Sequence, residues 1–285
     1  MEKSAAGLEM QKNIILNSLR ESLASAWKNK MLFIFLFLLQ LIFFSVFSVV
    51  NYYYQSKIIQ SSNEIFDYLS RQKLDELSVA DNLLQQKNIM GEDYMLISRN
   101  FNDITRNFRV YMAYVFILLV IFSSVSWTLT NQFFGSINIK KLSRILSRNF
   151  IVLLFYLGII FLFFFSLLNV SIMQLTADTS KLFTKYIVFL GASIILAYFM
   201  FISLSLANRA ELRNIAQKTL IIGIKKAHYV LPAYVINILL FAVPAFLSYR
   251  FIESPFILFS SLILIVFSFV FGRMLMVRVI DKLEN

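Results

Sequence analysis

The sequence predicts an all-α, polytopic integral membrane protein with six transmembrane helices, basic interfacial helices and an extracytoplasmic helical hairpin insert. Of its 285 residues, 59% are apolar and only 15% are charged. Soluble domains usually contain about 25% charged residues and less than about 50% apolar ones, so this composition excludes a soluble globular protein. Several apolar segments also approach or exceed the ~20 residues that cross a hydrocarbon core.

Six apolar segments are predicted to cross the membrane as helices, with five or seven as the alternative counts. Phe, Leu and Ile dominate each segment, and none has an Asp, Glu, Lys or Arg near its centre. A buried helix of a soluble protein would rarely be this long without a charge. The predicted transmembrane segments are residues 31–50, 110–128, 150–173, 186–207, 229–249 and 256–272.

The positive charges predict the orientation of the chain. The segments on one predicted side contain 17 Lys and Arg but only 6 Asp and Glu, whereas those on the other side contain 10 of each. Because Lys and Arg are enriched in cytoplasmic loops, we expect a multi-pass protein of the cell membrane with both termini in the cytoplasm. The predicted cytoplasmic segments are residues 1–30, 129–149, 208–228 and a tail, 273–285.

The first three cytoplasmic segments are basic, and apolar residues recur in them at helical spacing. Such helices lie in the headgroup plane with Lys and Arg facing anionic lipid, and each charge contributes about 1 kcal/mol. Ordinary positive-inside topology, without any lipid specificity, is the alternative explanation. The candidate anionic-lipid contacts are Arg20, Lys28, Lys140, Lys141, Arg144, Arg148, Lys218, Lys225 and Lys226.

The same three segments suggest an internal repeat. Each precedes a pair of predicted spans, and each contains two basic positions eight residues apart. These pairs are Arg20 and Lys28, Lys140 and Arg148, and Lys218 and Lys226. The pattern favours three copies of an interfacial helix followed by a hairpin. Chance placement of basic residues beside membrane spans explains it equally well.

Residues 51–109 form a long insert between the first two spans, in which apolar residues recur at helical intervals. Ser61 and Glu64 match a capping-box pattern that could begin a helix, and Gly91 is suited to a helix end. We therefore expect a helical hairpin. Its apolar stripe either packs within the hairpin or binds a partner protein. The candidate partner-docking residues are Ile58, Ile65, Leu69, Leu77, Phe101, Ile104 and Phe108.

The predicted spans contain few strongly polar groups. Ionisable residues inside a membrane mark ion-coupled transport sites, and none is expected at mid-depth in this chain. The amides of Gln40 and Asn237 are the most informative polar groups there, because an amide in hydrocarbon needs a hydrogen-bond partner. These two side chains either bond each other or mark a polar cavity.

No catalytic pattern is present in the sequence. The chain has no cysteine and a single histidine, His228, which excludes thiolate chemistry and histidine metal clusters. The metalloprotease, serine-hydrolase and phosphate-binding loop motifs are also absent. We expect no enzymatic activity, no metal and no cofactor. The net charge of +11 is spread along membrane-flanking segments, so we expect no nucleic-acid partner.

The layout of six apolar segments, with basic segments before the first, third and fifth, resembles that of uncharacterised six-helix prokaryotic membrane proteins. It is also similar to the membrane domain attached to some glycerophosphodiester phosphodiesterases. The resemblance covers most of the chain and implies a six-helix membrane fold. It implies no catalytic residues, because it includes no part of the phosphodiesterase catalytic domain.

Two functional hypotheses follow from these observations. The first is a non-catalytic membrane subunit or scaffold that binds membrane lipids, other membrane proteins, or both. The alternative is a membrane transport protein, such as the permease half of an ATP-driven exporter. In an exporter, the segment 129–149 would be the helix that couples to the ATPase.

Overall fold

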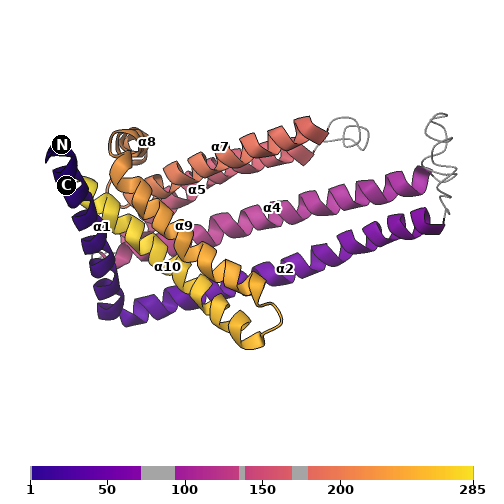
Figure 1. The fold of residues 1–285 in the computed structure, drawn as a ribbon, viewed down its shortest axis with the longest axis horizontal. Coiled ribbons are helices and arrows are strands. Elements are labelled where there is room, and N and C mark those ends of the chain that lie inside the picture. Colours follow the sequence, from indigo (N-terminus) through magenta and orange to yellow (C-terminus); the bar gives the residue numbers. More distant parts are fainter. Residues whose placement is uncertain (1, 72–93, 135–138, 169–178, 285) are drawn as a thin grey trace. The chain divides into compact units, whose positions relative to one another are not determined.

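The computed structural model describes residues 2–71, 94–134, 139–168 and 179–284. Every secondary-structure element in these ranges is helical, which confirms the all-α class (Figure 1). In chain order the elements are α1 (Glu2–Lys28), α2 (Lys30–Arg71), α4 (Tyr94–Gln132), α5 (Ile139–Leu168), α7 (Thr179–Leu206), α8 (Leu212–Leu220), the π-helical η1 (Ile221–Lys225), α9 (Ala227–Arg250) and α10 (Pro255–Glu284).

Six helices, α2, α4, α5, α7, α9 and α10, are long and apolar enough to cross a membrane. Each contains one of the six predicted segments, or nearly all of it. Residues 169–173 of the third segment lie outside the described residues. The described part of the chain is therefore compatible with a multi-pass membrane protein of six spans.

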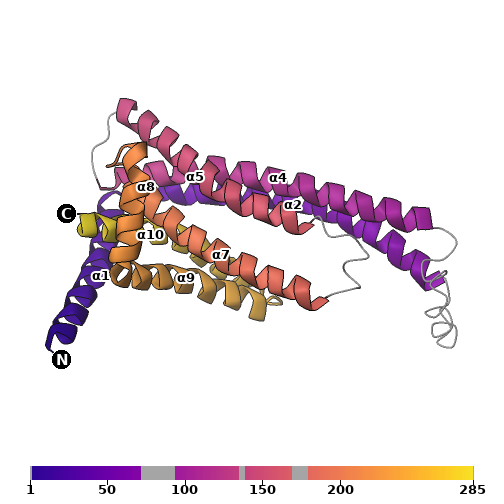
Figure 2. The ribbon, with the colours of Figure 1, turned by 90° about the horizontal axis from the view of Figure 1, so that it is seen from above.

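The chain divides into two compact units. Unit 1 consists of residues 1–43 and 119–285, and unit 2 consists of residues 44–118. Within unit 1, α10 packs against α9, α1 and α7, and α5 packs against α7. The pairs α9–α10 and α5–α7 lie side by side in both views (Figures 1 and 2).

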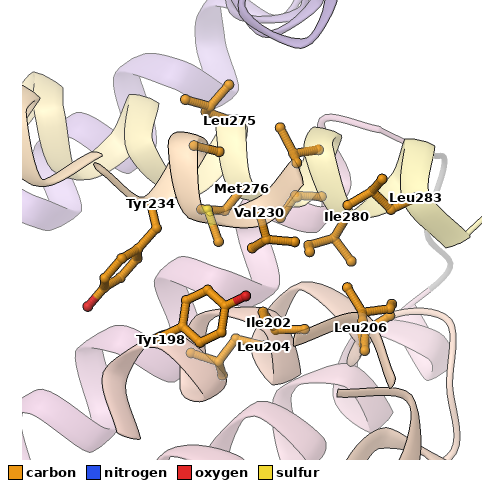
Figure 3. Close-up of a cluster of buried hydrophobic side chains, with 14 of the residues drawn as sticks. Tyr198, Ile202, Leu204, Leu206, Val230, Tyr234, Leu275, Met276, Ile280 and Leu283 are labelled. Atoms are coloured by element: carbon orange, nitrogen blue, oxygen red, sulfur yellow. The ribbon is translucent and has the colours of Figure 1, made fainter. Parts of the chain in front are cut away.

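The main hydrophobic core of unit 1 includes residues of α7, α9 and α10 (Figure 3). Ile202 and Leu206 of α7, Val230 of α9, and Leu275 and Ile280 of α10 are almost completely buried in it. Inside a membrane the hydrophobic effect contributes little to helix association, because lipid tails are as apolar as leucine. Close packing and dispersion between these side chains contribute to holding the helices together.

Residues 273–284 of the predicted cytoplasmic tail are the last part of α10, which continues without a break to Glu284. Residues Met274, Leu275 and Met276 are fully buried, so this stretch packs into unit 1. The prediction ended the last span at Gly272. The structure shows that the next residue, Arg273, lies within the same helix.

The three basic segments do not form three equivalent interfacial helices. The first and third contain the separate helices α1 and α8, whereas residues 139–149 are the beginning of α5. Residues 129–132 belong to α4, and residues 135–138 lie outside the described residues. No Gly or Pro occurs between Ile139 and Leu157, so nothing in this sequence ends the helix before the apolar segment begins.

The helix start predicted at Ser61 is wrong, because α2 runs from Lys30 to Arg71. The hydroxyl of the neighbouring Ser62 donates a hydrogen bond of 2.8 Å to the carbonyl oxygen of Ile58, as serine commonly does within a helix. The second helix of the insert begins by Tyr94. The helix end predicted near Gly91 lies outside the described residues.

A glycine permits a close contact beside the π-helical segment η1. A Cβ atom at Gly223 would lie only 2.6 Å from Cε1 of Phe199 in α7. The hydroxyl of Tyr198 donates a hydrogen bond of 3.0 Å to the carbonyl oxygen of Gly223. The wider turn of a π-helix alters the normal hydrogen-bond pattern, and Tyr198 satisfies a buried carbonyl there.

We expect Gly272→Ala to destabilise the contact between α9 and α10. Asn237 Nδ2 donates a hydrogen bond of 3.1 Å to the Gly272 carbonyl, and a Cβ at this glycine would lie 2.9 Å from Asn237 Oδ1. Relieving that overlap should lower the free energy of unfolding by about 1–3 kcal/mol. The change would be measured as a lower Tm in detergent.

The matched control for this substitution is Gly158→Ala in α5, where an added Cβ meets no atom within 4 Å. Alanine favours a helix over glycine by up to about 1 kcal/mol, so this variant should be as stable as the wild type or more stable. Equal losses in both variants would contradict the close approach of α9 and α10 at Gly272.

Candidate functional site

The C-terminal end of α10 carries a network of ion pairs. Asp281 pairs with Arg278 of the same helix at 3.0 Å and with Arg209, which lies between α7 and α8. Glu21 of α1 pairs with Lys282 at 2.8 Å and with Arg278 at 3.4 Å. The network therefore connects α10 to α1 and to the segment that follows α7.

Three of the nine predicted lipid contacts are bound within the chain. Lys218 of α8 pairs with Glu284, and Lys226 donates a hydrogen bond to the carbonyl oxygen of Leu283. Arg148 donates hydrogen bonds of 3.3 and 2.9 Å to the carbonyls of Ala207 and Ala210, just beyond α7. The last carbonyls of a helix lack helical partners, so cations placed there stabilise helix ends.

The other six predicted lipid contacts have exposed side chains. They lie on α1, on the first turns of α5 and in η1. These residues are Arg20, Lys28, Lys140, Lys141, Arg144 and Lys225. The structure thus separates the nine cations into three that stabilise the fold and six whose charge faces the surroundings.

A buried arginine lies in α10, five residues before Arg278 of the ion-pair network. Arg273 is 7% exposed, and its Nη1 donates a hydrogen bond of 3.2 Å to Oε1 of Gln40 in α2, which is 6% exposed. The Nε and Nη2 atoms of Arg273 have no hydrogen-bond partner. The sequence pattern predicts Arg273 in a tail and so does not identify it as buried, although it identifies Gln40 as an amide that needs a partner.

The two amides singled out from the sequence do not bond each other. Gln40 accepts from Arg273, whereas Asn237 of α9 donates to the carbonyl of Gly272, the adjacent residue of α10. Successive residues of a helix point about 100° apart, so these hydrogen bonds lie on different faces of α10. The two amides attach α2 and α9 to neighbouring positions of the same helix.

Further buried polar contacts connect the helices of unit 1. Asn149 of α5 donates a hydrogen bond of 2.9 Å to the hydroxyl of Thr128 in α4. The hydroxyl of Ser203 in α7 lies 3.1 Å from that of Tyr156 and 3.0 Å from that of Thr219. In a membrane, such bonds between helices contribute about 0.6–2 kcal/mol each. Because these hydrogen bonds connect neighbouring helices, they indicate a structural role for the buried polar residues.

In unit 2, α2 and α4 border an open groove of about 1140 Å³ with a largely polar and charged lining. Tyr54 of α2 lies against Tyr111 and Tyr114 of α4, with ring centroids 6.1 and 5.8 Å apart. Five predicted docking residues are half-buried, namely Ile58, Ile65, Phe101, Ile104 and Phe108. The side chain of Leu69 and the whole of Leu77 lie outside the described residues.

The half-burial of these five residues favours packing within the insert over direct binding of a partner. The groove contains cations and carboxylates together, including Lys57, Glu64, Arg99 and Asp103. Among the described residues, no group of three or more His, Asp or Glu side chains is placed to hold a metal ion. The groove is therefore a mixed polar surface without a recognisable reaction centre.

No family model, curated protein or solved structure matches this chain. The functional argument therefore depends on two features of unit 1. These are the division of its cations into bound and exposed groups, and the buried contact between Arg273 and Gln40.

We expect Asp281→Asn to destabilise unit 1, because the substitution leaves Arg209 and Arg278 without their shared carboxylate. Hydrogen bonds to charged groups contribute about 1.5–3 kcal/mol, so the free energy of unfolding should fall by that amount. Asp103→Asn is the control, because its ion pair with Arg106 is much more exposed. It should cost less than about 1 kcal/mol. Tm values in detergent that are equally lowered would contradict the role assigned to Asp281.

Proposed function

We propose that the protein is a non-catalytic integral membrane subunit or scaffold, with both termini in the cytoplasm, that binds anionic lipids, partner membrane proteins, or both. The observation that carries this proposal is the group of six exposed cations on α1, the start of α5 and η1. Under the proposed orientation, these cations meet the cytoplasmic headgroups. The fold uses three other cations, Arg148, Lys218 and Lys226, in contacts within the chain. Within the part of the chain that the structure describes, the six exposed cations make no such contact that the fold requires, so their charge is available to lipid.

The side chains of α1 support contact with a lipid surface. Leu16, Leu23 and Trp27 are exposed, although they are apolar, whereas Ser18 and Ser22 are completely buried. The helix therefore packs into unit 1 through small serines and leaves large apolar groups outside. Exposed apolar residues together with cations are what an interfacial helix presents to headgroups and acyl chains.

The end of α1 and the beginning of α2 show the same combination. Trp27 is 75% exposed, and the ammonium of Lys30 lies 4.4 Å from its ring centroid. Tryptophan is enriched at membrane interfaces because its ring is apolar and its N–H group is polar. We therefore assign this corner to the cytoplasmic interface, where α1 would lie along the surface and α2 would enter the bilayer.

The proposed orientation is tested with single cysteines, because the chain contains none of its own. Asn102→Cys in unit 2 and Ser143→Cys in α5 both replace exposed residues. An impermeant thiol reagent added to intact cells should label the first variant and leave the second unlabelled until the cells are opened. Labelling of Ser143→Cys in intact cells would reverse the orientation and remove the cytoplasmic assignment.

Lipid binding is tested by replacing Lys140, Lys141 and Arg144 together with glutamine. Each cation near an anionic surface contributes about 1 kcal/mol, so the loss of three should weaken the association with phosphatidylglycerol roughly 100-fold. The measurement is the amount of phosphatidylglycerol retained by the purified protein in mild detergent, determined by mass spectrometry.

A second triple variant provides the control for net charge. It replaces Lys57, Arg99 and Arg106 of unit 2 with glutamine, which removes three positive charges from a surface that also contains carboxylates. This variant should retain nearly the wild-type amount of phosphatidylglycerol. If both triple variants lose lipid equally, the association depends on net charge, and the six exposed cations have no specific role.

A transport function is the second candidate, and the buried Arg273 is the observation that favours it. An ionisable group inside a membrane span commonly marks a solute or ion pathway. The more specific exporter alternative has less support, because residues 139–149 are the beginning of α5 rather than a separate coupling helix. The scaffold therefore remains the proposed function, with Arg273 as a feature that it does not explain.

A further inference from the structure

We propose that Arg273 and Gln40 form a binding site, inside the helix bundle of unit 1, for a small oxyanion such as a phosphate group. The site is distinct from the exposed cations to which lipid binding was assigned. It depends on α2 and α10 crossing the membrane, but not on the scaffold function. The ligand class follows from burial, from the absence of a counter-charge and from the geometry of the guanidinium.

The first step is the burial of the charge. Arg273 is 7% exposed, and its helix neighbours Val270 and Met274 are completely buried in an apolar cluster that also includes Leu36 of α2. Gln40 lies ten residues after Lys30, about 15 Å along α2, and Arg273 lies eighteen residues after Pro255, about 27 Å along α10. Both distances are shorter than the ~30 Å thickness of a hydrocarbon core, so under the proposed orientation the guanidinium would lie within the core, in its cytoplasmic half.

The second step is the absence of a counter-charge at this depth. The sequence contains no Asp or Glu between Glu253 and Asp281, and none in residues 30–63, 104–177, 179–210 or 212–252. Asp281 is eight residues from Arg273, about 12 Å along α10, and already pairs with Arg209 and Arg278. The membrane-crossing helices therefore supply no carboxylate to neutralise Arg273.

The third step is the chemistry of the group itself. An arginine does not lose its proton in proteins, so it must keep its charge when buried. A buried cation without a partner is strongly destabilising. The amide of Gln40 supplies one hydrogen-bond acceptor but no negative charge, so it orients the guanidinium without neutralising it. A bound anion would supply the missing charge.

The fourth step is the direction of the unused donors. Nη1 is the atom that bonds Gln40, which leaves Nε and Nη2 without partners. These two atoms lie on one edge of the planar guanidinium, and their N–H bonds point the same way. That edge matches two oxygens of a phosphate or carboxylate in a bidentate contact. Gln40 therefore leaves free the edge that recognises an oxyanion.

The experiment measures the Tm of the purified protein in a sugar detergent that contains no phosphate. One arm adds inorganic phosphate against chloride at equal ionic strength, and the other adds phosphatidylglycerol to the detergent micelles. A ligand present at about 100 times its Kd should raise the Tm of the wild type by roughly 5–10 °C. Which arm responds distinguishes a free anion from a lipid phosphate.

Two variants test the site itself. Arg273→Met should lose the response and, without added anion, should be at least as stable as the wild type, because an uncompensated buried charge has been removed. Gln40→Leu should weaken the response, because the guanidinium loses its orienting acceptor. Arg213→Met is the control for charge, since Arg213 is an exposed cation of α8, and it should respond like the wild type.

The wild-type titration alone can overturn the proposal, whether or not a variant folds. If neither phosphate nor phosphatidylglycerol shifts the wild-type Tm, there is no anion site at Arg273. A shift that persists in Arg273→Met also overturns it. The variant lacking Lys140, Lys141 and Arg144 should keep the response to phosphate, so failure of the surface lipid proposal and failure of this one give different results.

Discussion

The second half of α10 is both buried and charged, and the rest of unit 1 depends on how that conflict is resolved. From Val266 to Glu284 most of its residues are buried, while Arg273, Arg278, Asp281 and Glu284 belong to the same stretch. A buried charge is tolerated only when it is paired and hydrogen-bonded. The neighbours of α10 therefore had to supply the partners, and the ion-pair network is what attaches α1 and the α7–α8 connection to this helix.

This requirement explains why basic residues of similar sequence context have different roles. Arg148 and Lys226 both bind carbonyl oxygens near the end of a helix, where backbone acceptors have no helical partner. Lys140 and Lys141 lie at the beginning of α5 and remain exposed. The bound cations therefore differ from the exposed ones in having a backbone oxygen or a carboxylate of another element within reach.

The sequence was sufficient to predict the class of the fold and six apolar helices, because these depend on composition and length alone. It was not sufficient to predict how far each helix continues. The extension of α10 beyond Gly272 depends on packing against α1, α7 and α9, which no local pattern reveals. For the same reason, the capping-box pattern at Ser61 had no effect within the long helix α2.

For the candidate sites, too, features that depend on the local sequence were predicted, whereas contacts with residues distant in the chain were not. Charge and helical spacing predicted all nine cations as lipid contacts and did not distinguish the three that are bound within the chain. Their partners, such as Glu284 and the Ala210 carbonyl, are more than 60 residues away in the chain. Gln40 was recognised because an amide in an apolar segment is unusual, whereas Arg273 was assigned to the tail because an apparent end of the span preceded it.

Arg278 and Arg273 lie five residues apart on α10 and show two solutions to the same physical problem. Arg278 has the carboxylates of Glu21 and Asp281 and also packs on the ring of Phe134, so its charge is compensated within the chain. Arg273 has only the neutral amide of Gln40. A carboxylate at position 40 would neutralise Arg273 and leave no reason to bind an anion. The amide preserves the charge and fixes its direction, and this distinction separates a binding site from a structural ion pair.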